Sequence, residues 1–331
     1  MSKKDEITEK SIDNYELNLI INVVKKYYKM GMTQDQIAKE EFISKSTVSR
    51  LLKKATERGI VNFQINYPVD SVEDFEGEFH KYFDINHVLI APTLADDYET
   101  RLKDTCRMAA SDLCKIIQPE DYLGIGWGLT MEQLTDILTQ EYLIKKKCSK
   151  VIMIDGSIAS EVDSIKSSYI IKELADFFSA DGFLFPVPMV VDSKETAEIL
   201  RNDSHIKYVM DFIKQVRIAI FGIGYASNES VLRRRGAYSK EDYDDVLTLG
   251  AVGDILGHCF DIHGKPVSGR LDGCITGIDL PTLKEREYRI GIAVGNQKVK
   301  AIIGALRGKY VSRLYTDSET AREVIRLMKI H

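Results

Sequence analysis

Three successive segments near the start of the chain carry apolar residues at helical spacing. Residues 15–30 form the first, and Gly31 marks its end. A second, shorter helix is predicted over about 33–40, because Thr33 precedes Gln36 at the spacing of a capping box. Together these segments predict a compact helical unit.

The third segment begins at Ser44, an N-cap residue, and runs to about Arg58, before Gly59 ends it. One side of this helix carries an apolar stripe: Val48, Leu51, Leu52 and Ala55. The opposite side is small, polar and basic: Ser46, Ser49, Arg50 and Lys53, with Thr47 and Lys54 on its flank. Such a surface suits the major groove of DNA, since short hydroxylated residues admit close approach and basic residues bind phosphates or guanine.

A short helix, a tight turn and a basic helix face in succession predict a helix-turn-helix domain over residues 1–67. Alternation in residues 60–65 adds one strand of a wing. The residues predicted to contact double-stranded DNA are Thr33, Gln34, Ser44, Lys45, Ser46, Thr47, Ser49, Arg50, Lys53 and Lys54. An ordinary three-helix bundle with a solvated face remains the alternative.

The net charge of −5 conceals an asymmetry between the two parts of the chain. Residues 1–67 carry 12 Lys and Arg against 9 Asp and Glu, a balance of +3, so the rest of the chain carries −8. Within residues 42–64, five basic residues stand against one acidic residue, Glu57. This basic cluster lies on the predicted third helix, which is where a polyanion would bind.

Beyond Pro68, which ends the wing, strand-like runs alternate with helical patterns. The acidic stretch Val69–Phe83 predicts a connecting helix, so we place a domain boundary near Pro68, with residues 68–331 as the second domain. The strand-like runs are His87–Ala91, Tyr122–Gly126, Lys150–Asp155, Arg217–Gly224, Tyr288–Gly295 and Ser312–Thr316. Helical patterns such as Ser167–Phe178 and Val299–Leu306 separate them. The alternation predicts an α/β domain with a mostly parallel sheet, whose ligands bind beyond the carboxyl ends of the strands.

The richest strand end is the run Gly124–Thr130, which closes one strand and opens the helix Met131–Leu138. Its glycines permit close backbone approach and the helix N-terminus presents N–H groups, so a phosphate can dock there. The dinucleotide fingerprint would need a glycine at Leu129, which disfavours a nicotinamide site, and no cofactor is predicted. A tight turn with a packed Trp127 is the alternative.

Five further glycine turns fall at or near predicted strand ends: Asp155–Ser157, Gly222–Gly224, Gly250–Asp254, Asp261–Gly264 and Gly295–Lys298. Lys298 can give an ammonium group to a phosphate, while Asp155 and Asp254 accept hydrogen bonds from hydroxyls, the combination that a sugar phosphate requires. Each segment taken singly is an ordinary turn. Their recurrence at strand ends predicts a ligand site.

Composition and cysteine spacing exclude several other classes. The 331 residues are 44% hydrophobic and 29% charged, and no run approaches the ~18 uncharged apolar residues of a membrane span. We therefore expect a cytoplasmic protein without a membrane partner. The five cysteines are widely spaced and odd in number, which argues against a disulfide framework and a zinc site: Cys106, Cys114, Cys148, Cys259 and Cys274. No metal is predicted.

The chain resembles the SorC family of sugar-binding transcriptional regulators, which includes deoxyribonucleoside regulators of bacteria. The runs that carry the resemblance are TQDQIAKE with SKSTVSRLLKKA (Thr33–Ala55), GWGLT (Gly126–Thr130), AVGDILGHCFDIHG (Ala251–Gly264), AVGNQKVKAIIGALRG (Ala293–Gly308) and TDSETA (Thr316–Ala321). The resemblance implies a Rossmann-like α/β effector domain, similar to sugar-phosphate isomerases of the glucosamine-phosphate deaminase type. It also implies phosphorylated sugars bound without turnover, and a homotetramer. At least a homodimer is expected independently, because a helix-turn-helix needs two half-sites arranged by protein symmetry.

Carried onto this sequence, the resemblance assigns a phosphate to the Gly126–Thr130 loop and Lys298, and the sugar to Asp254. The predicted effector-binding residues are Gly126, Trp127, Gly128, Leu129, Thr130, Asp155, Gly156, Gly222, Asp254, Asp261 and Lys298. Asp155 stands where some deoxyribonucleoside regulators have a lysine that forms a Schiff base with an open-chain sugar, so covalent capture there is not expected. Val294 stands where the family has a glycine, a departure expected to alter the loop before Lys298.

The leading hypothesis is a DNA-binding regulator whose operator affinity is tuned by a phosphorylated sugar. A sugar-phosphate isomerase or deaminase with an accessory helical domain is the alternative, and a constitutive architectural DNA-binding protein is a third. Catalysis needs a positioned acid/base set. Of the six histidines only His258 and His263 lie near a glycine turn, so no enzymatic activity is predicted. The expected partners are double-stranded operator DNA, a phosphorylated sugar effector and further copies of the chain.

Overall fold

The chain divides into two compact units. The computed structural model describes residues 16–57, 60–61, 72–85, 87–92, 97–142, 146–158 and 161–330. One unit comprises Met1–Asn66 with Gln140–Ile144, and the other comprises Tyr67–Thr139 with Lys145–His331. Residues 62–70 lie outside the described residues, so the boundary near Pro68 stays a prediction. Among the helices that the structure describes, none has the length and apolar character that a membrane span needs.

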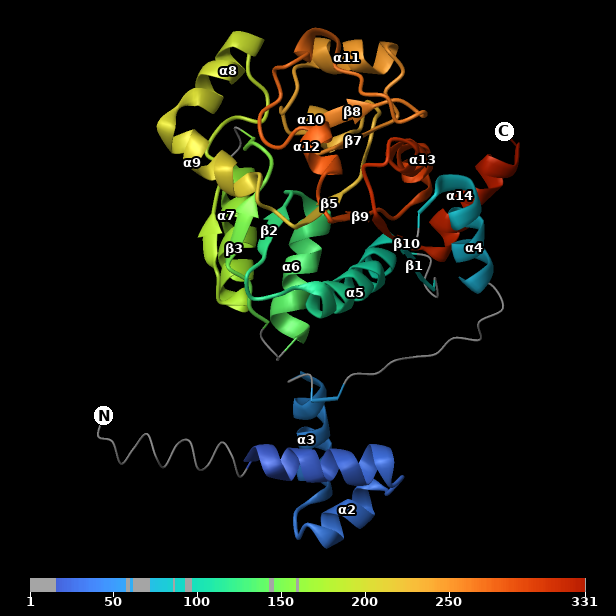
Figure 1. Ribbon diagram of the computed structural model, residues 1–331. Helices are drawn as coiled ribbons and strands as arrows, with labels where there is room; N and C mark the ends of the chain where they lie inside the picture. Colours follow the sequence, from blue (N-terminus) through green and yellow to red (C-terminus); the bar gives the residue numbers. More distant parts are fainter. Residues whose placement is uncertain are drawn as a thin grey trace. The chain divides into compact units, whose positions relative to one another are not determined.

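The N-terminal unit is built from short helices (Figure 1). Residues 16–24 are α-helical and continue into the π-helical turn η1 (Lys25–Lys29), followed by α2 (Gln34–Glu40) and α3 (Lys45–Glu57). The predicted capping box is confirmed, because the Gln36 N–H donates to Thr33 Oγ1 at 3.3 Å and the Thr33 N–H donates to Gln36 Oε1 at 2.8 Å. Residues 41–44 form the turn between α2 and α3.

The apolar stripe predicted on the third helix forms the core of this unit. Val48, Leu51, Leu52 and Ala55 are all buried, and they pack with Ile20, Val23, Ile37 and Ala38 of the preceding helices. The Thr47 N–H donates to Ser44 Oγ at 3.1 Å, which confirms Ser44 as the cap of α3. Residues 60–61 form a bend, and residues 62–65 lie outside the described residues, so the wing strand stays a prediction.

The second unit contains a seven-stranded sheet of strand order β1-β10-β9-β5-β2-β3-β4, in which every neighbouring pair is parallel. Its strands are β1 (Val88–Ala91), β2 (Tyr122–Ile125), β3 (Lys150–Met153), β4 (Asp181–Phe183), β5 (Ile218–Gly222), β9 (Tyr288–Ile292) and β10 (Arg313–Asp317). The prediction of a parallel α/β sheet is confirmed for the six runs that the sequence marked. The short edge strand β4 has no apolar alternation and was missed.

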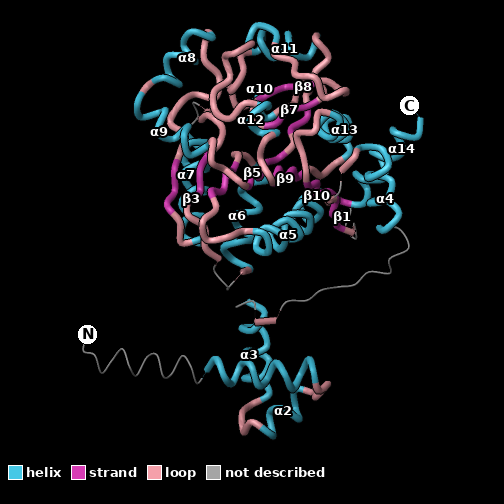
Figure 2. Tube along the Cα trace, in the orientation of Figure 1, coloured by secondary structure: helices cyan, strands magenta, loops and turns pink. Residues whose placement is uncertain are grey.

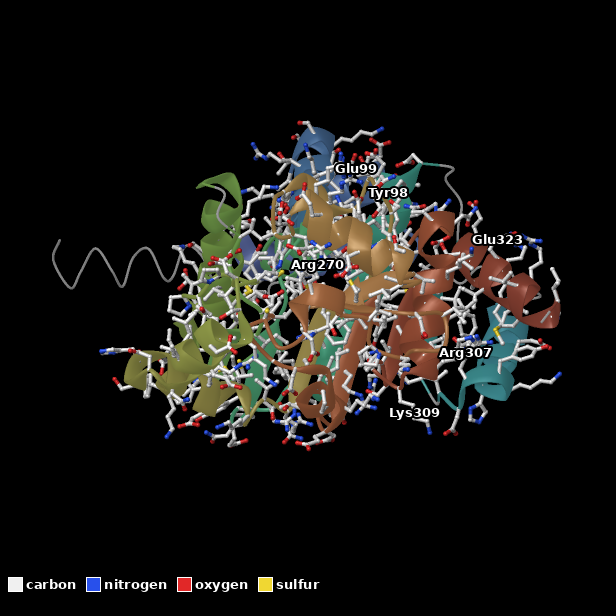
Figure 3. All side chains as sticks on the ribbon, turned by 90° about the horizontal axis from the view of Figure 1, so that it is seen from above. Tyr98, Glu99, Arg270, Arg307, Lys309 and Glu323 are labelled. Atoms are coloured by element: carbon white, nitrogen blue, oxygen red, sulfur yellow. The ribbon has the colours of Figure 1, made fainter. Side chains whose placement is uncertain are left out.

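Helices and loops surround this sheet (Figure 2). The helical segments are α4 (Val72–Phe83), α5 (Tyr98–Ile116), α6 (Leu129–Glu141), α7 (Glu161–Phe178), α8 (Lys194–Asn202), α9 (Ser204–Ile213), α10 (Val231–Arg234), α11 (Lys240–Thr248), η2 (Gly269–Leu271), α12 (Leu280–Lys284), η3 (Asn296–Lys298), α13 (Val299–Arg307) and α14 (Ser318–Ile330). α5 packs on β1, β9 and β10, and α7 packs on β3 and β4. Exposed charged side chains such as Arg270, Arg307 and Lys309 extend from the surface (Figure 3).

A second, three-stranded antiparallel sheet was not predicted. It consists of β6 (Gly224–Tyr225), β7 (Gly253–Ile255) and β8 (His258–Phe260). β6 follows β5 almost directly, and its Gly224 pairs with Asp254 of β7. A Cβ on Gly224 would lie 1.9 Å from Asp254 Oδ1, so glycine is required for this close approach. The small sheet thereby places Asp254 just beyond the carboxyl end of β5.

All five cysteines are buried and free. Burial raises the pKa of the Cys106 and Cys148 thiols to about 12. Because the thiolate is the reactive form, these side chains are inert packing groups at neutral pH.

Candidate functional site

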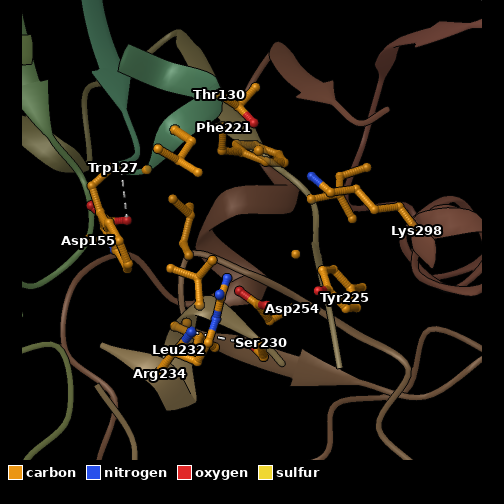
Figure 4. Close-up of a pocket in the computed structure, with 18 of the residues that line it drawn as sticks. Trp127, Thr130, Asp155, Phe221, Tyr225, Ser230, Leu232, Arg234, Asp254 and Lys298 are labelled. Atoms are coloured by element: carbon orange, nitrogen blue, oxygen red, sulfur yellow. Dashed lines mark hydrogen bonds between the residues drawn. The ribbon is translucent and has the colours of Figure 1, made fainter. Parts of the chain in front are cut away.

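A cavity of about 300 Å³ opens at the carboxyl ends of β2, β3 and β5 (Figure 4). Eight of the eleven predicted effector-binding residues line it: Trp127, Gly128, Leu129, Thr130, Asp155, Gly222, Asp254 and Lys298. The position agrees with the rule that parallel sheets bind ligands where their strands end.

The loop between β2 and α6 forms one wall of the cavity. Gly128 has a φ of +117°, a conformation that favours glycine, and a Cβ built there would meet open space. The N–H groups of Met131 and Glu132 both donate to the Gly128 carbonyl at 2.9 Å, which starts the helix. The N–H groups of Leu129 and Thr130, at the first two helical positions, precede the intrahelical ladder and add to the positive end of the helix dipole. This wall therefore suits an anionic group of a ligand.

Lys298 brings a cationic side chain to the same cavity (Figure 4). It is the last residue of η3, directly before α13, and only 8% of its surface is exposed. Burial lowers the pKa of Lys298 to about 8, although the negative charge of Asp254 acts in the opposite direction. A bound anion would favour the charged ammonium form in this low-dielectric setting.

Two buried carboxyl groups complete the polar lining. Asp155 follows β3, is 2% exposed, and its Oδ2 accepts a hydrogen bond from the Trp127 N–H at 3.3 Å. Its Oδ1 has no hydrogen-bond partner among the described residues. Burial raises the pKa of Asp155 to about 8 and that of Asp254 to about 6, with Lys298 counteracting the second shift. An unpartnered buried oxygen is costly, and a ligand hydroxyl would supply its missing hydrogen bond.

Asp155→Asn is expected to flatten the pH dependence of stability. The pKa of Asp155 rises from 3.8 to about 8 on folding, so the unfolded chain releases this proton at lower pH than the folded chain does. The folded protein therefore loses stability as pH rises through this window, by at most about 1.4 kcal/mol per pH unit for one proton. Thermal unfolding of the ligand-free protein at pH 5 and pH 8 measures the slope, with the exposed Asp192→Asn as control. Equal slopes for parent and Asp155→Asn would contradict this assignment.

Three predicted residues do not reach the cavity wall. A Cβ on Gly126 would lie 2.8 Å from Leu256 Cδ2, and one on Gly156 would lie 2.4 Å from Met189 Cα, so both glycines serve close packing. Asp261 Oδ1 accepts hydrogen bonds from the N–H groups of His263 and Lys265, each at 2.9 Å. These three residues therefore lie outside the cavity lining, and their contact with an effector stays a prediction.

Several residues of the cavity were missed by sequence reasoning. They include Tyr98, Tyr225, Ser230, Arg234 and Gln297. Arg234 belongs to a run of three arginines that is indistinguishable from a solvated charge cluster, and α10 is too short to show a helical period. For Gln297 the sequence did offer a signal, because this residue stands beside Lys298 in the loop that follows a predicted strand.

Val294 fits the loop without strain. Its side chain is fully buried, and it is absent from the non-glycine residues with positive φ in the described structure. Among the described residues 293–298, Gly295 is the one with a positive φ, +108°. The expected change of loop geometry at Val294 stays a prediction.

The outward face of α3 has the predicted character. Ser46, Ser49, Arg50 and Lys53 are exposed, and Thr47 and Lys54 are half-buried. Two flanking lysines are engaged in ion pairs, Lys45 with Asp35 at 2.8 Å and Lys54 with Glu16 at 2.5 Å. The hydroxyls of Thr33 and Ser44 serve as helix caps, and Gln34 is the half-buried first residue of α2. The centre of the face is thus Ser46, Ser49, Arg50 and Lys53.

Fold and site define an α/β protein whose cavity suits a small polar ligand, with a separate helical unit. Residues 67–326 match the family model of a sugar-binding domain. The chain is 30% identical over 316 residues to the deoxyribonucleoside regulator of Bacillus subtilis, covering 95% of this chain and 99% of that protein. It is 27% identical over 315 residues to the sorbitol operon regulator of Klebsiella pneumoniae, covering 94% and 98%.

The crystal structure of the full-length sorbitol operon regulator SorC from Klebsiella pneumoniae matches the fold with a TM-score of 0.77 at 27% identity, covering 93% of this chain and 98% of that one. The Escherichia coli transcriptional regulator LsrR is 30% identical over 308 residues, covering 91% of this chain and 92% of that protein. The chain therefore belongs to the SorC family of sugar-binding transcriptional regulators.

Proposed function

We propose that this chain is a DNA-binding transcriptional regulator whose operator affinity is controlled by a phosphorylated sugar. The observation that carries the proposal is the convergence, in one cavity, of a helix N-terminus, the buried Lys298 ammonium and two buried carboxyl groups. Relatives named as deoxyribonucleoside and sorbitol operon regulators support the class of ligand.

The phosphate belongs at the junction of the β2–α6 loop and Lys298. A phosphate carries about two negative charges, and its removal from water demands N–H donors and a compensating cation. The first turn of α6 supplies the donors and Lys298 supplies the cation. Asp155 and Asp254 then face the sugar, whose hydroxyls form hydrogen bonds with the two carboxyl groups. Eight of the eleven residues predicted to bind the effector line this cavity, which supports the assignment.

DNA binding belongs to the N-terminal helices, with α2 and α3 as a helix-turn-helix. The exposed face of α3 presents two cations and two short hydroxyl side chains, which suits phosphates and base edges in the major groove. The short α2, the four-residue turn and the capped start of α3 support this geometry. A bacterial regulator of this kind binds chromosomal DNA, which lies in the cytoplasm, so the cytoplasm is the proposed location of the protein.

The runner-up function is a sugar-phosphate isomerase or deaminase, since such enzymes bind the same ligands. The relatives named as transcriptional regulators favour the regulator. His258, the histidine nearest the site in sequence, donates from Nε2 to the Ile278 carbonyl at 3.1 Å, and burial lowers its pKa to about 4. It is absent from the cavity lining, which disfavours it as an acid/base group.

A titration of DNA binding against a panel of sugars tests the proposal. The full-length protein first selects a duplex from a random pool, and aldose and ketose phosphates are then added beside the matching unphosphorylated sugars. We expect at least one phosphorylated sugar to change the DNA affinity, with no product formed on prolonged incubation. Turnover of the sugar phosphate would favour the enzyme. A DNA affinity that no sugar changes would favour an architectural protein.

The protein is expected to assemble through its second unit as a dimer or tetramer. One helix-turn-helix reads only a few base pairs, so specificity generally takes two half-sites arranged by protein symmetry. A chain that starts near residue 69 should therefore keep the assembly state of the full chain. Sedimentation of both at micromolar concentration measures this, and a monomeric truncated chain beside an oligomeric parent would move the interface to the N-terminal unit.

A further inference from the structure

The segment Thr316–Ala321, one of the runs that carry the family resemblance, contacts the loop that carries Lys298. β10 ends at Asp317 and α14 begins at Ser318. The N–H of Gly295 donates to Thr320 Oγ1 at 2.8 Å. Asn296 Nδ2 donates to Glu319 Oε1 at 3.0 Å. Two consecutive residues shortly before Lys298 are thus attached to the first turn of α14.

The hydroxyl of Thr320 is held in one orientation. It donates its proton to Asp317 Oδ2, which leaves the oxygen lone pairs for the Gly295 N–H. Asp317 Oδ1 accepts the N–H groups of Glu319 and Thr320, each at 3.1 Å. Both Asp317 and Thr320 are fully buried, so water does not compete for these bonds.

A buried arginine from α5 holds the two acidic residues of this segment. Arg101 is 8% exposed, and its guanidinium lies 3.3 Å from Asp317 Oδ1 and hydrogen-bonds Glu319. The positive charge of Arg101 compensates the buried carboxylate of Asp317, which would otherwise be expensive to ionise. Arg101 lies three residues after Tyr98, which lines the cavity at the start of α5.

The contact to Thr320 fixes the backbone that leads directly to Lys298. The Gly295 carbonyl accepts the N–H of Lys298 at 2.9 Å, while the Gly295 N–H is bonded to Thr320. Gly295 has a φ of +108°, and because glycine has no Cβ this residue imposes little conformational preference of its own on the turn. Asp317 Oδ1 is sufficient to cap α14, so the hydrogen bond from the Gly295 N–H to Thr320 Oγ1 is not needed for capping.

We propose that Thr320, oriented by Asp317 and Arg101, is a positioning residue that holds the Lys298 side chain in the effector cavity. The proposal rests on the proposed function only in naming a phosphate as the group that Lys298 meets. The hydrogen bond to Gly295 sets the path of the loop, and the loop sets where the ammonium group lies. Loss of that bond leaves Lys298 less buried and less well directed.

Thr320→Val in the full-length protein removes the hydroxyl at nearly constant volume. Thr320→Ser keeps the hydroxyl, and Thr316→Val is the matched control, because Thr316 is equally buried and its Oγ1 has no hydrogen-bond partner among the described residues. We expect Thr320→Val to weaken binding of inorganic phosphate about tenfold, as for a buried N–H left unpaired. Thr320→Ser should bind within about twofold of the parent, and Thr316→Val should bind as the parent does.

A second measurement does not depend on any ligand. The pKa of Lys298 is followed by NMR of lysines labelled at the ε-carbon, and in the parent it is about 8 because of burial. Thr320→Val should move it toward 10.5, and Thr320→Ser should restore it. If the parent binds no phosphate yet this shift occurs, the phosphate assignment fails and the positioning role stands.

An unchanged Lys298 pKa in Thr320→Val would overturn the positioning role, whatever happens to phosphate affinity. If Thr320→Val does not fold, Asn296→Ala replaces it, since Asn296 is exposed and the substitution removes only its bond to Glu319. The same displacement of the Lys298 pKa, of smaller size, is expected there. Its absence would count equally against the proposal.

Discussion

Lys298→Ala is expected to lower the affinity for the sugar phosphate about 10- to 150-fold while DNA binding without effector stays unchanged. A charge-assisted contact to a phosphate contributes ~1.5 to 3 kcal/mol, which corresponds to that range of affinity. The effect should be large because Lys298 is 8% exposed, where solvent screens its charge weakly. Calorimetry with the sugar phosphate that emerges from the DNA-binding panel measures the loss.

Lys300→Ala is the matched control for this experiment. Lys300 lies two residues further along, on α13, and is exposed. Its removal changes the net charge by the same amount without touching the cavity. If Lys298→Ala binds the sugar phosphate as tightly as Lys300→Ala does, the phosphate site is wrongly placed. Equal affinity of the parent for the unphosphorylated sugar would also contradict the phosphate site.

The parallel sheet and most of the cavity follow from local sequence signals. Buried parallel strands leave continuous apolar runs, and their carboxyl ends all lie along the same edge of the sheet. Gly128, Asp155 and Lys298 come from three distant parts of the chain, yet each lies a few residues after the end of a strand. Parallel strands place these residues along one edge of the sheet, and the strand order, in which β9, β5, β2 and β3 are consecutive, brings them into one cavity.

Asp261 illustrates where local signals fail. It resembles Asp254 in sequence, since both stand in a glycine-containing turn after an apolar run. The two are separated by the β7–β8 hairpin, in which Asp254 pairs with Cys259. Because β8 runs antiparallel to β7, it ends beside the start of β7, where the Val252 N–H donates to the Phe260 carbonyl at 2.9 Å. Asp261 follows Phe260 and therefore lies at the opposite end of the hairpin from the β7–β8 turn. Only the antiparallel pairing, which depends on non-local contacts, distinguishes the two aspartates.

The N-terminal helices were predictable for a different reason. A capping box and an N-cap serine are satisfied within three or four residues, so Thr33 and Ser44 specify helix starts without tertiary information. The same locality fixes which side chains of α3 face outward, because Val48, Leu51 and Ala55 must be buried together. The function of that outward face depends on a partner and has to be tested with DNA.

Replacing Arg50 and Lys53 together by alanine is expected to weaken DNA binding about 100-fold or more at moderate salt. Both side chains are exposed on the outward face of α3, and in the proposed complex each makes a charge-assisted hydrogen bond to a phosphate that the substitution removes. Each substitution should also reduce the slope of log affinity against log salt by roughly 0.9, because one counterion fewer is released. Filter binding of the selected duplex at several salt concentrations measures affinity and slope together.

The control for this double variant is Lys172→Ala with Lys214→Ala, which removes two positive charges from exposed positions of the second unit. A general effect of net charge would weaken DNA binding equally in both double variants, whereas a recognition helix predicts the loss only for the Arg50 and Lys53 pair. Effector binding should be unchanged in both, since the cavity lies in the second unit and neither pair lines it. An unchanged affinity and an unchanged slope in the α3 variant would remove α3 from the DNA interface.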